Sequence, residues 1–460
     1  MNVRKGVSDG MKHYDVIFLG SGHSCNHGGL MLAASGKKVA FVEQEKMGGT
    51  CTNYGCDAKI LLDGPFEFLE GLKRYEGLCV KSDVSIDWTA LMKYKKQTLG
   101  VFDPLLEQMF GQLGIDVIRG RGVLKDAHTV EVGDACYSAD YIVIGTGARN
   151  AKLNIPGAEH THGSRHFLDL ETMPEHMICI GAGIISMEFA SMALMLGKKV
   201  TFFEFAPRAL MAYPEDYVQR LTAKMEAQGA QFHFSAAVAS VEQTAGGFRV
   251  TAKDGTAAEG DYVLDATGRI ANVEDLGLEA LGIQASRRGI VVDDHMRTAV
   301  PNIYASGDVV DKKIPKLTPT AEFESNYIAA QILGLSDQPI RYPAVPNLVF
   351  TLPRIGQTGV TLAEAKAAPE RYRIVNIPWG KQNDWVDNHE TDADVTLIFD
   401  AEGYLAGAAI YGSEAGTWLD FLTPVIDKRM TALDLSSMIM SFPTQTYMMW
   451  SALVPQLKRF

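Results

Sequence analysis

The chain has 460 residues, a formal net charge of −12 and six cysteines. Its length allows two to four domains, and its acidic balance argues against nucleic acid or an anionic membrane as a partner. Cysteines this sparse argue against a secreted disulfide scaffold. The first residues lack the apolar stretch of a signal peptide. We therefore expect a cytoplasmic protein in which residues 1–10 form a loose tail before Met11.

The first predicted elements form a strand–helix–strand unit. Apolar runs at residues 14–19 and 38–43 flank a glycine-containing turn and a helix. Gly20 permits the tight turn, and Gly22 lets the backbone approach a pyrophosphate at the helix N-terminus. Glu43, at the end of the second strand, can accept hydrogen bonds from a ribose diol. The pattern predicts a dinucleotide-binding fold.

Three possible metal ligands alternate at the start of this helix, namely His23, Cys25 and His27. Residues two apart on a helix point about 200° away from each other, so the three cannot all converge on one ion. We expect them to serve packing and predict no metal. Cys25 stands where the nucleotide motif has its third glycine, so helix and strand should pack slightly wider. Three further cysteines are isolated and are predicted to be core thiols: Cys79, Cys136 and Cys179.

A cysteine pair follows in the stretch GGTCTNYGCDAK, where Cys51 and Cys56 lie five positions apart. Such a pair could be a structural disulfide, half of a metal site, or a dithiol that opens and closes during catalysis. A reducing cytoplasm disfavours the structural disulfide. The spacing alone leaves the other two open.

The next predicted elements are an amphipathic helical region at residues 87–114, strands within 116–144 and a glycine-rich turn at 145–149. A second strand–helix–strand unit follows at 177–205, and strands then alternate with turns through residue 265. From residue 341 onward the chain reads as a separate α+β unit.

The second nucleotide site is predicted at Gly181, Gly183 and Ser186, with Glu204 ending its second strand. A carboxylate there would repel the 2′-phosphate of NADP, which favours NAD. Arg208, four residues further on, could partly offset this preference.

One apolar stretch, residues 435–455, carries no formal charge, but Pro443, Thr444 and Gln445 interrupt it. A membrane-spanning helix would be more continuously apolar. We therefore predict a buried interface between subunits and no membrane association.

Four motifs in order resemble those of the flavoprotein disulfide reductases, the pyridine nucleotide–disulfide oxidoreductases that include dihydrolipoamide dehydrogenase, glutathione reductase and mercuric reductase. The motifs are GGTCTNYGCDAK, ATGRIAN (266–272), ASGDV (305–309) and FTLPRIGQTGVTLAEA (350–365). The resemblance covers essentially the whole chain. It implies an α/β homodimer with two Rossmann-like dinucleotide-binding domains, for FAD and NAD, and a C-terminal α+β dimerisation domain. The expected boundaries are 11–150 and 271–338 for the FAD domain, 151–270 for the NAD domain and 339–460 for the dimerisation domain.

The resemblance also implies roles for individual residues. Cys56 would lie against the flavin, and Cys51 would be the interchange thiol that attacks substrate. Lys59 matches a lysine near flavin N5, with Glu188 as its partner, and a cation there can stabilise reduced flavin and thiolate. Asp308 would bind the ribityl chain. Further motif residues implied in cofactor binding are Gly49, Thr50, Gly147 and Gly268.

The C-terminal motif departs from the family. The reductases usually end in HPTxxE, whose His and Glu reach from the other subunit as an acid–base dyad beside the interchange thiol. Here the stretch reads FPTQTY, so Phe442 takes the histidine position and Tyr447 the glutamate position. In addition, Asp57 and Ala58 replace the proline and serine that usually follow the second cysteine.

Without this dyad, lipoamide and glutathione disulfide are disfavoured as efficient substrates, because an acid–base group typically contributes ~10²–10⁴-fold. The small-molecule acceptor could be a disulfide with a good leaving thiol, or a redox acceptor that needs no side-chain proton. Alternatives are a metal ion, as in mercuric reductase, carbanion chemistry like that of 2-ketopropyl coenzyme M oxidoreductase/carboxylase, and NADH oxidation by oxygen or quinones. A flavin-bound redox sensor without turnover is the non-enzymatic alternative.

Overall fold

The structure, a computed structural model, describes residues 11–81, 84–383, 385–386 and 388–459, so the predicted N-terminal tail lies outside the described residues. The chain divides into two compact units. Unit 1 comprises Met1–Lys59, Lys93–Ala151 and Gly268–Arg341. Unit 2 comprises Ile60–Met92, Lys152–Thr267 and Tyr342–Phe460.

Unit 1 is built on a seven-stranded sheet. The strands, in spatial order, are β3 (Asp116–Arg119), β2 (Val39–Glu43), β1 (Lys12–Leu19), β6 (Ala135–Ile144), β5 (Thr129–Val132) and β4 (Gly122–Leu124), with β18 (Ile303–Ala305) also paired to β6. The pairs among β3, β2, β1, β6 and β18 are parallel, whereas β4 and β5 form an antiparallel flap. Strands that are covered on both faces have continuous apolar sequences, and for this reason the sequence predicts β1 and β2.

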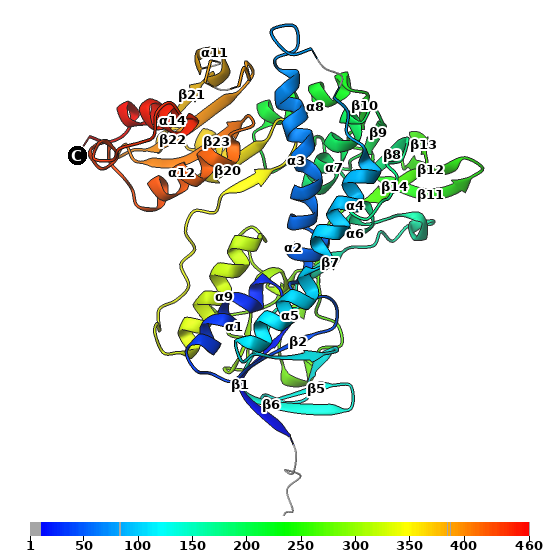
Figure 1. Ribbon diagram of the computed structural model, residues 1–460, viewed down its shortest axis with the longest axis vertical. Helices are drawn as coiled ribbons and strands as arrows, with labels where there is room; N and C mark the ends of the chain where they lie inside the picture. Colours follow the sequence, from blue (N-terminus) through cyan, green and yellow to red (C-terminus); the bar gives the residue numbers. More distant parts are fainter. Residues whose placement is uncertain (1–10, 82–83, 384, 387, 460) are drawn as a thin grey trace, which may run out of the picture. The chain divides into compact units, whose positions relative to one another are not determined.

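The helices between residues 23 and 112 are α1 (His23–Ala34), α2 (Gly49–Tyr54), α3 (Cys56–Lys73), α4 (Trp88–Leu99) and α5 (Phe102–Gln112), and α9 (Thr318–Ile332) follows later in unit 1. The predicted amphipathic region thus consists of two helices, α4 and α5. Helices α1 and α9 lie side by side in unit 1 (Figure 1). They approach closely because Gly28 has no side chain: a Cβ there would lie 2.4 Å from the Ser325 carbonyl oxygen, and the Gly28 N–H donates to Ser325 Oγ at 2.8 Å.

Unit 2 contains the second parallel sheet, in the order β10 (Ala230–His233), β9 (Lys199–Phe203), β8 (His176–Ile180) and β14 (Tyr262–Asp265). Helix α7 (Ile184–Met195) connects β8 to β9, as predicted. The antiparallel strands β11 (Val238–Thr244), β12 (Gly247–Ala252) and β13 (Ala257–Gly260) form a smaller sheet. The expectation of strands and turns alone through residue 265 is wrong, because α8 (Glu215–Ala227) is a 13-residue helix that buries Tyr217, Val218, Leu221 and Met225.

The C-terminal part of unit 2 is a five-stranded antiparallel sheet. Its order is β19 (Asn347–Val349), β20 (Ile355–Gly359), β23 (Leu405–Tyr411), β22 (Asp394–Asp400) and β21 (Tyr372–Ile377). Helix α12 (Ala415–Asp427) packs on this sheet, and Trp379 and Trp418 are fully buried in its core. The apolar stretch 435–455 folds into the end of α13 (Ala432–Ser436), α14 (Gln445–Leu453) and a short 3-10 turn. Across the described part of the chain, no helix has the length and apolar character needed to cross a membrane.

Residues 60–92 belong to unit 2 through buried ion pairs. Arg354 donates to both carboxylate oxygens of Asp63, with Nη1 3.2 Å from Oδ1, and both side chains are almost fully buried. Arg74 donates to Glu390 at 3.1 Å. Breaking such a buried pair leaves an uncompensated charge, so these contacts hold α3 and the residue that follows it against the C-terminal part of unit 2.

Candidate functional site

The first glycine loop joins β1 to α1. Gly20 has φ +117°, and a Cβ there would lie 2.6 Å from the Gly145 carbonyl oxygen, so only glycine fits. Gly22 precedes α1 and has no side chain to cap the helix, which leaves its first N–H groups to a ligand. The buried Glu43 carboxylate fixes the loop because its Oε2 accepts from Ser21 N at 3.0 Å and from Ser21 Oγ at 2.8 Å.

Cys25, in the place of the third glycine, is fully buried. Its Sγ lies 3.9 Å from the carbonyl oxygens of Leu19 and Gly145. A Cβ on Gly145 would come within 2.1 Å of that sulfur, so the glycine that follows β6 makes the room that Cys25 needs. The predicted core position of Cys179 is confirmed, but Cys79 and Cys136 are exposed.

Three motif segments distant in sequence converge beside this loop. Strand β7 (Ala148–Asn150) pairs with β15 (Arg269–Ala271), which joins the turn containing Gly147 to the one containing Gly268. Both glycines have positive φ, +69° and +142°. Asp308 lies in a 3-10 turn (Gly307–Val309), with its Oδ2 4.0 Å from Arg269 Nη2. The motif residues assigned to one cofactor thus gather in unit 1.

The second glycine loop, in unit 2, repeats the bonding of the first. Gly181 has φ +95°, and Gly183 precedes α7 without a side-chain cap. Ser186 Oγ donates to the Gly181 carbonyl oxygen at 2.7 Å. The buried Glu204 accepts from Ala182 N at 2.6 Å and from Ala206 N at 2.8 Å. Ala182 and Ser21 occupy the same place between two glycines, so both loops are held by the terminal glutamate of the following strand.

Arg208 is fixed by the backbone rather than directed to a ligand. Its guanidinium donates to four carbonyl oxygens, those of Ala209, Leu210, Met211 and Tyr213, at 2.9–3.2 Å. A guanidinium has five N–H donors. Arg208 therefore has little remaining capacity to bind a phosphate.

The cysteine pair lies on two consecutive helices, with Cys51 in α2 and Cys56 as the first residue of α3. In the reduced form the Cys51 thiol donates to the Cys56 sulfur, and this hydrogen bond lowers the pKa of Cys56 to about 6 and raises the pKa of Cys51. Thr318 Oγ1 lies 3.4 Å from Cys56 Sγ and, with the charge of Lys59, lowers the Cys56 pKa further. A helix N-terminus also favours a thiolate. The surroundings of the two sulfurs therefore differ, and Thr318, Lys59 and the start of α3 favour a thiolate at Cys56.

The residues before Cys51 connect the pair to the first glycine loop. Gly48 forms a parallel β-bridge with Gly22. A Cβ on Gly49 would lie 2.9 Å from the Gly22 Cα, so the two loops touch through glycine alone. Thr50 follows within α2. The dithiol and the nucleotide loop therefore belong to one site.

Two predicted partners, Lys59 and Glu188, belong to different units, and their pairing stays a prediction. Within unit 2, Glu188 is buried in α7, where its Oε1 accepts from Phe350 N at 2.9 Å.

The C-terminal motif presents aromatic side chains. The Phe442 and Tyr447 rings meet edge to face, with centroids 5.0 Å apart, and the Tyr447 ring lies 5.4 Å from that of Trp450. Thr444 Oγ1 accepts from Tyr447 N at 3.1 Å and so caps α14. The Phe442 side chain is 67% exposed in the single chain.

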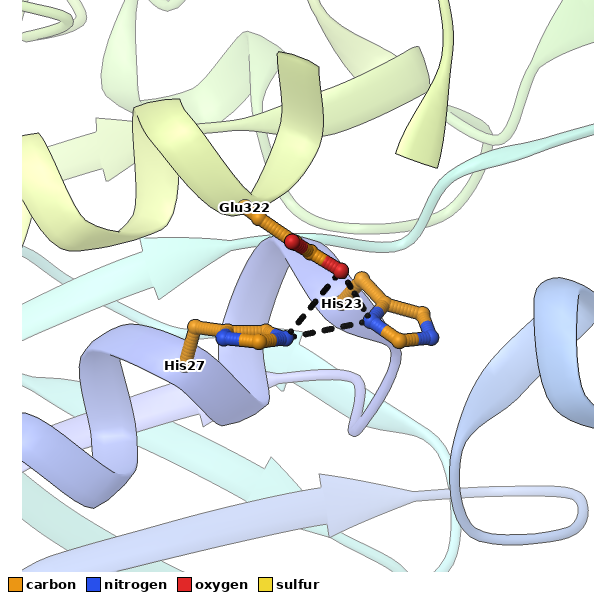
Figure 2. Close-up of side chains that lie close together, drawn as sticks. All are labelled: His23, His27 and Glu322. Carbon is orange, nitrogen blue, oxygen red and sulfur yellow. Dashed lines mark hydrogen bonds and ion pairs between the residues drawn. The ribbon is translucent and has the colours of Figure 1, made fainter. Parts of the chain in front are cut away.

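The sequence did not indicate two residues of α9. Thr318, at the start of this helix, reaches Cys56 from 262 residues away. Glu322 joins His23 and His27 in a cluster (Figure 2). Cys25 points away from this cluster, as the helical geometry predicted. The i, i+4 spacing of the two histidines in the sequence places them on one face of a helix, but the sequence does not indicate Glu322, because it lies on another helix.

Comparisons with known proteins identify the family. A family model described as pyridine nucleotide-disulphide oxidoreductase matches residues 14–325, and one described as its dimerisation domain matches residues 345–453. The chain belongs to this family of oxidoreductases.

Curated relatives match along nearly the whole chain. Dihydrolipoyl dehydrogenase of Bacillus subtilis is 29% identical over 443 residues, covering 94% of this chain and 93% of that protein. Glutathione reductase of Burkholderia cepacia is 28% identical, with 94% and 96% covered. Among solved structures, the HOCl-induced flavoprotein disulfide reductase RclA of Escherichia coli has the same fold, with TM-score 0.86, 24% identity, and 97% and 100% covered. The expected α/β fold with Rossmann-like and dimerisation domains is confirmed.

The family uses FAD and a pyridine nucleotide, and the described residues fit both. Each glycine loop offers uncapped helix N–H groups to a pyrophosphate. At the first loop, apart from its chain neighbours, the described residues that lie within 4 Å of a Cβ placed on Gly22 are Gly48 and Gly49. When bound, the flavin supplies the means of converting hydride transfer into disulfide reduction.

Proposed function

We propose that this enzyme passes electrons from NADH through FAD and the Cys51–Cys56 pair to a small acceptor that takes no proton from a side chain. The observation that carries the proposal is the combination of an asymmetric dithiol with aromatic rings, Phe442 and Tyr447, in the positions of the acid–base dyad. The electron path of the family is retained, and its usual proton path is absent.

The cysteines take different roles in this proposal. The stabilised charge on Cys56 supports its place against the flavin, and Cys51 attacks the acceptor. For a disulfide acceptor, the Cys51 thiol loses its proton to water and its thiolate attacks one sulfur of the acceptor. A mixed disulfide forms as the acceptor's S–S bond breaks, and one thiolate leaves. Cys56 then attacks Cys51, which restores the Cys51–Cys56 disulfide and releases the second thiolate. Both leaving thiolates must be good leaving groups, because the C-terminal motif has neither a histidine nor a carboxyl group to protonate them.

We assign FAD to residues 11–150 and 271–338, and NAD to residues 151–270. Within the first assignment the convergence of Gly147, Gly268 and Asp308 beside the first glycine loop supports a common cofactor. Lys59, paired with Glu188, is placed near flavin N5.

NADH is preferred over NADPH in this proposal. Glu204 places a buried carboxylate at the end of β9, where it would repel a 2′-phosphate. Arg208 does not offset that charge, because backbone carbonyls occupy its guanidinium.

We propose a homodimer formed through residues 339–460, and the match to the dimerisation domain supports it. Residues near the C-terminal motif expose apolar side chains, namely Leu433, Met438, Ile439 and Phe442. Such a patch on a single chain is typical of a protein interface. A cytoplasmic location stays a prediction from the sparse cysteines.

The test is an anaerobic titration with NADH followed by absorbance. The reduced wild type should show a long-wavelength charge-transfer band from the Cys56 thiolate to the flavin. Cys56→Ser should lose the band, whereas Cys51→Ser should keep it, because Cys56 remains a thiolate. A band that persists in Cys56→Ser would refute the assigned roles.

A further inference from the structure

The His23–His27–Glu322 cluster lies outside the dithiol chemistry and brings three metal-binding groups together. His23 and His27 are one turn apart on α1, so both rings lie on the same face. Glu322 lies on α9, one turn before Ser325, whose close contact with Gly28 holds the two helices together. Figure 2 shows the three side chains converging between these helices.

The three ligand atoms form a nearly equilateral triangle. His23 Nδ1 is 3.2 Å from His27 Nε2 and 3.0 Å from Glu322 Oε1, and His27 Nε2 is 3.3 Å from the same oxygen. Around a tetrahedral ion with bonds of about 2.0–2.1 Å, ligand atoms are separated by roughly 3.3 Å. The triangle therefore has the size of one face of such a coordination sphere.

Hydrogen bonds alone satisfy this triangle poorly. If both rings donate to the carboxylate oxygen, their N–H dipoles converge on one acceptor while the two nitrogens lie only 3.2 Å apart. If only one donates to it, the other His–Glu contact places a nitrogen lone pair against a carboxylate oxygen. A cation at the centre satisfies all three atoms with neutral imidazoles and an ionised carboxylate.

We propose that His23 Nδ1, His27 Nε2 and Glu322 Oε1 bind one divalent transition-metal ion of the Zn²⁺ or Cu²⁺ class. Two imidazoles and one carboxylate are a common protein ligand set for such ions, with the fourth position left to water or an exogenous ligand. The three side chains are only partly buried, so the ion has access from solvent. The net charge of −12 also favours cation binding.

A second cluster, Asp293, Asp294 and His295, provides a matched control. Both ring nitrogens of His295 have hydrogen-bond partners, with Nδ1 2.7 Å from Asp294 Oδ1 and Nε2 3.0 Å from the Asp337 carbonyl oxygen. The His295 ring therefore has no spare lone pair for an ion, and we propose no site there.

The test measures Zn²⁺ affinity of the full-length, oxidised, FAD-loaded protein by chelator competition. His27→Ala and Glu322→Ala should each weaken binding by at least about 100-fold, since losing even an outer-shell partner costs about 10–100-fold. His295→Ala should bind like wild type. All variants keep the same cysteines, so binding by thiols cancels in the comparison, and flavin content checks that each variant is folded.

Electron paramagnetic resonance of the Cu²⁺-loaded protein provides an independent readout. Wild type should show hyperfine coupling to two nitrogens, and His27→Ala to one. Equal Zn²⁺ affinity in wild type, His27→Ala and Glu322→Ala, or a wild type that retains no ion, would overturn the proposal.

Discussion

The dithiol segment and the C-terminal motif have diverged to different degrees from the family to which the chain belongs. Around Cys51 and Cys56 the sequence is family-like, and the structure builds an asymmetric pair on two consecutive helices. Around Phe442 and Tyr447 the backbone motif is retained, including a threonine cap on α14, but the side chains are aromatic. The two regions therefore differ in which side chains of the family's motifs they keep: both cysteines are present, whereas aromatic residues stand at the positions of the dyad.

The largest expected effect comes from the dithiol. Cys51→Ser should lower acceptor-dependent NADH oxidation by about 10³-fold or more, because the attacking sulfur is removed. Steady-state NADH consumption measures this loss. Cys136→Ser, at an exposed cysteine outside the site, is the control and should retain full activity. Turnover unchanged in Cys51→Ser would mean that electrons leave from the flavin directly.

The C-terminal motif is tested by restoring its base. Phe442→His should raise the rate of glutathione disulfide or lipoamide reduction by about 10²-fold, the usual contribution of an acid–base group. Phe442→Leu changes the shape without adding a base, so it is the matched control. A similar gain in both variants, or no gain in either, would indicate that pocket shape excludes these substrates.

Substitutions of the glutamates that hold the two glycine loops should have a smaller effect, which is a change in the preference between NADPH and NADH. Glu204→Gln should raise the ratio of NADPH to NADH use about tenfold, which corresponds to roughly 1.4 kcal/mol of removed repulsion. Glu43→Gln makes the equivalent change in the other loop, where Glu43 holds Ser21, so it should alter flavin retention and leave the ratio unchanged. A wild type that prefers NADPH would contradict the role of Glu204.

The smallest effect concerns the pH at which the thiolate forms. Because the pKa of Cys56 is lowered to about 6, its thiolate should be present above pH 6, and the charge-transfer band should disappear as the pH falls through that value. Thr318→Val removes the hydroxyl near Cys56 and should move the midpoint upward by less than about one pH unit. A midpoint near pH 9 in the wild type would show that the asymmetry is absent.

Local patterns were sufficient to predict much of the fold and site. The two strand–turn–helix–strand units were visible because their strands are continuous apolar runs and their turns need glycine. Helix α8 lies between residues 205 and 265, where the sequence analysis predicts only strands and turns, although its buried side chains follow a helical period.

Long-range contacts set the limit of sequence analysis. Thr318 reaches the cysteines of α2 and α3, and Glu322 reaches the histidines of α1. Both contacts depend on the packing of α9 against α1 through Gly28 and Ser325. Nothing local in the sequence indicates which residues will meet 262 or more positions away. Cys25 stands between the two histidines in the sequence, whereas the third member of their cluster, Glu322, comes from another helix.

The most direct test of the central claim is the dependence of rate on the leaving thiol. A series of disulfide acceptors with leaving thiols of increasing pKa would be compared by kcat/KM under NADH. Wild type should slow steeply as that pKa rises, because no side chain protonates the departing thiolate. Phe442→His should show a shallower dependence. A flat dependence in the wild type, with rapid reduction of aliphatic disulfides, would contradict the account.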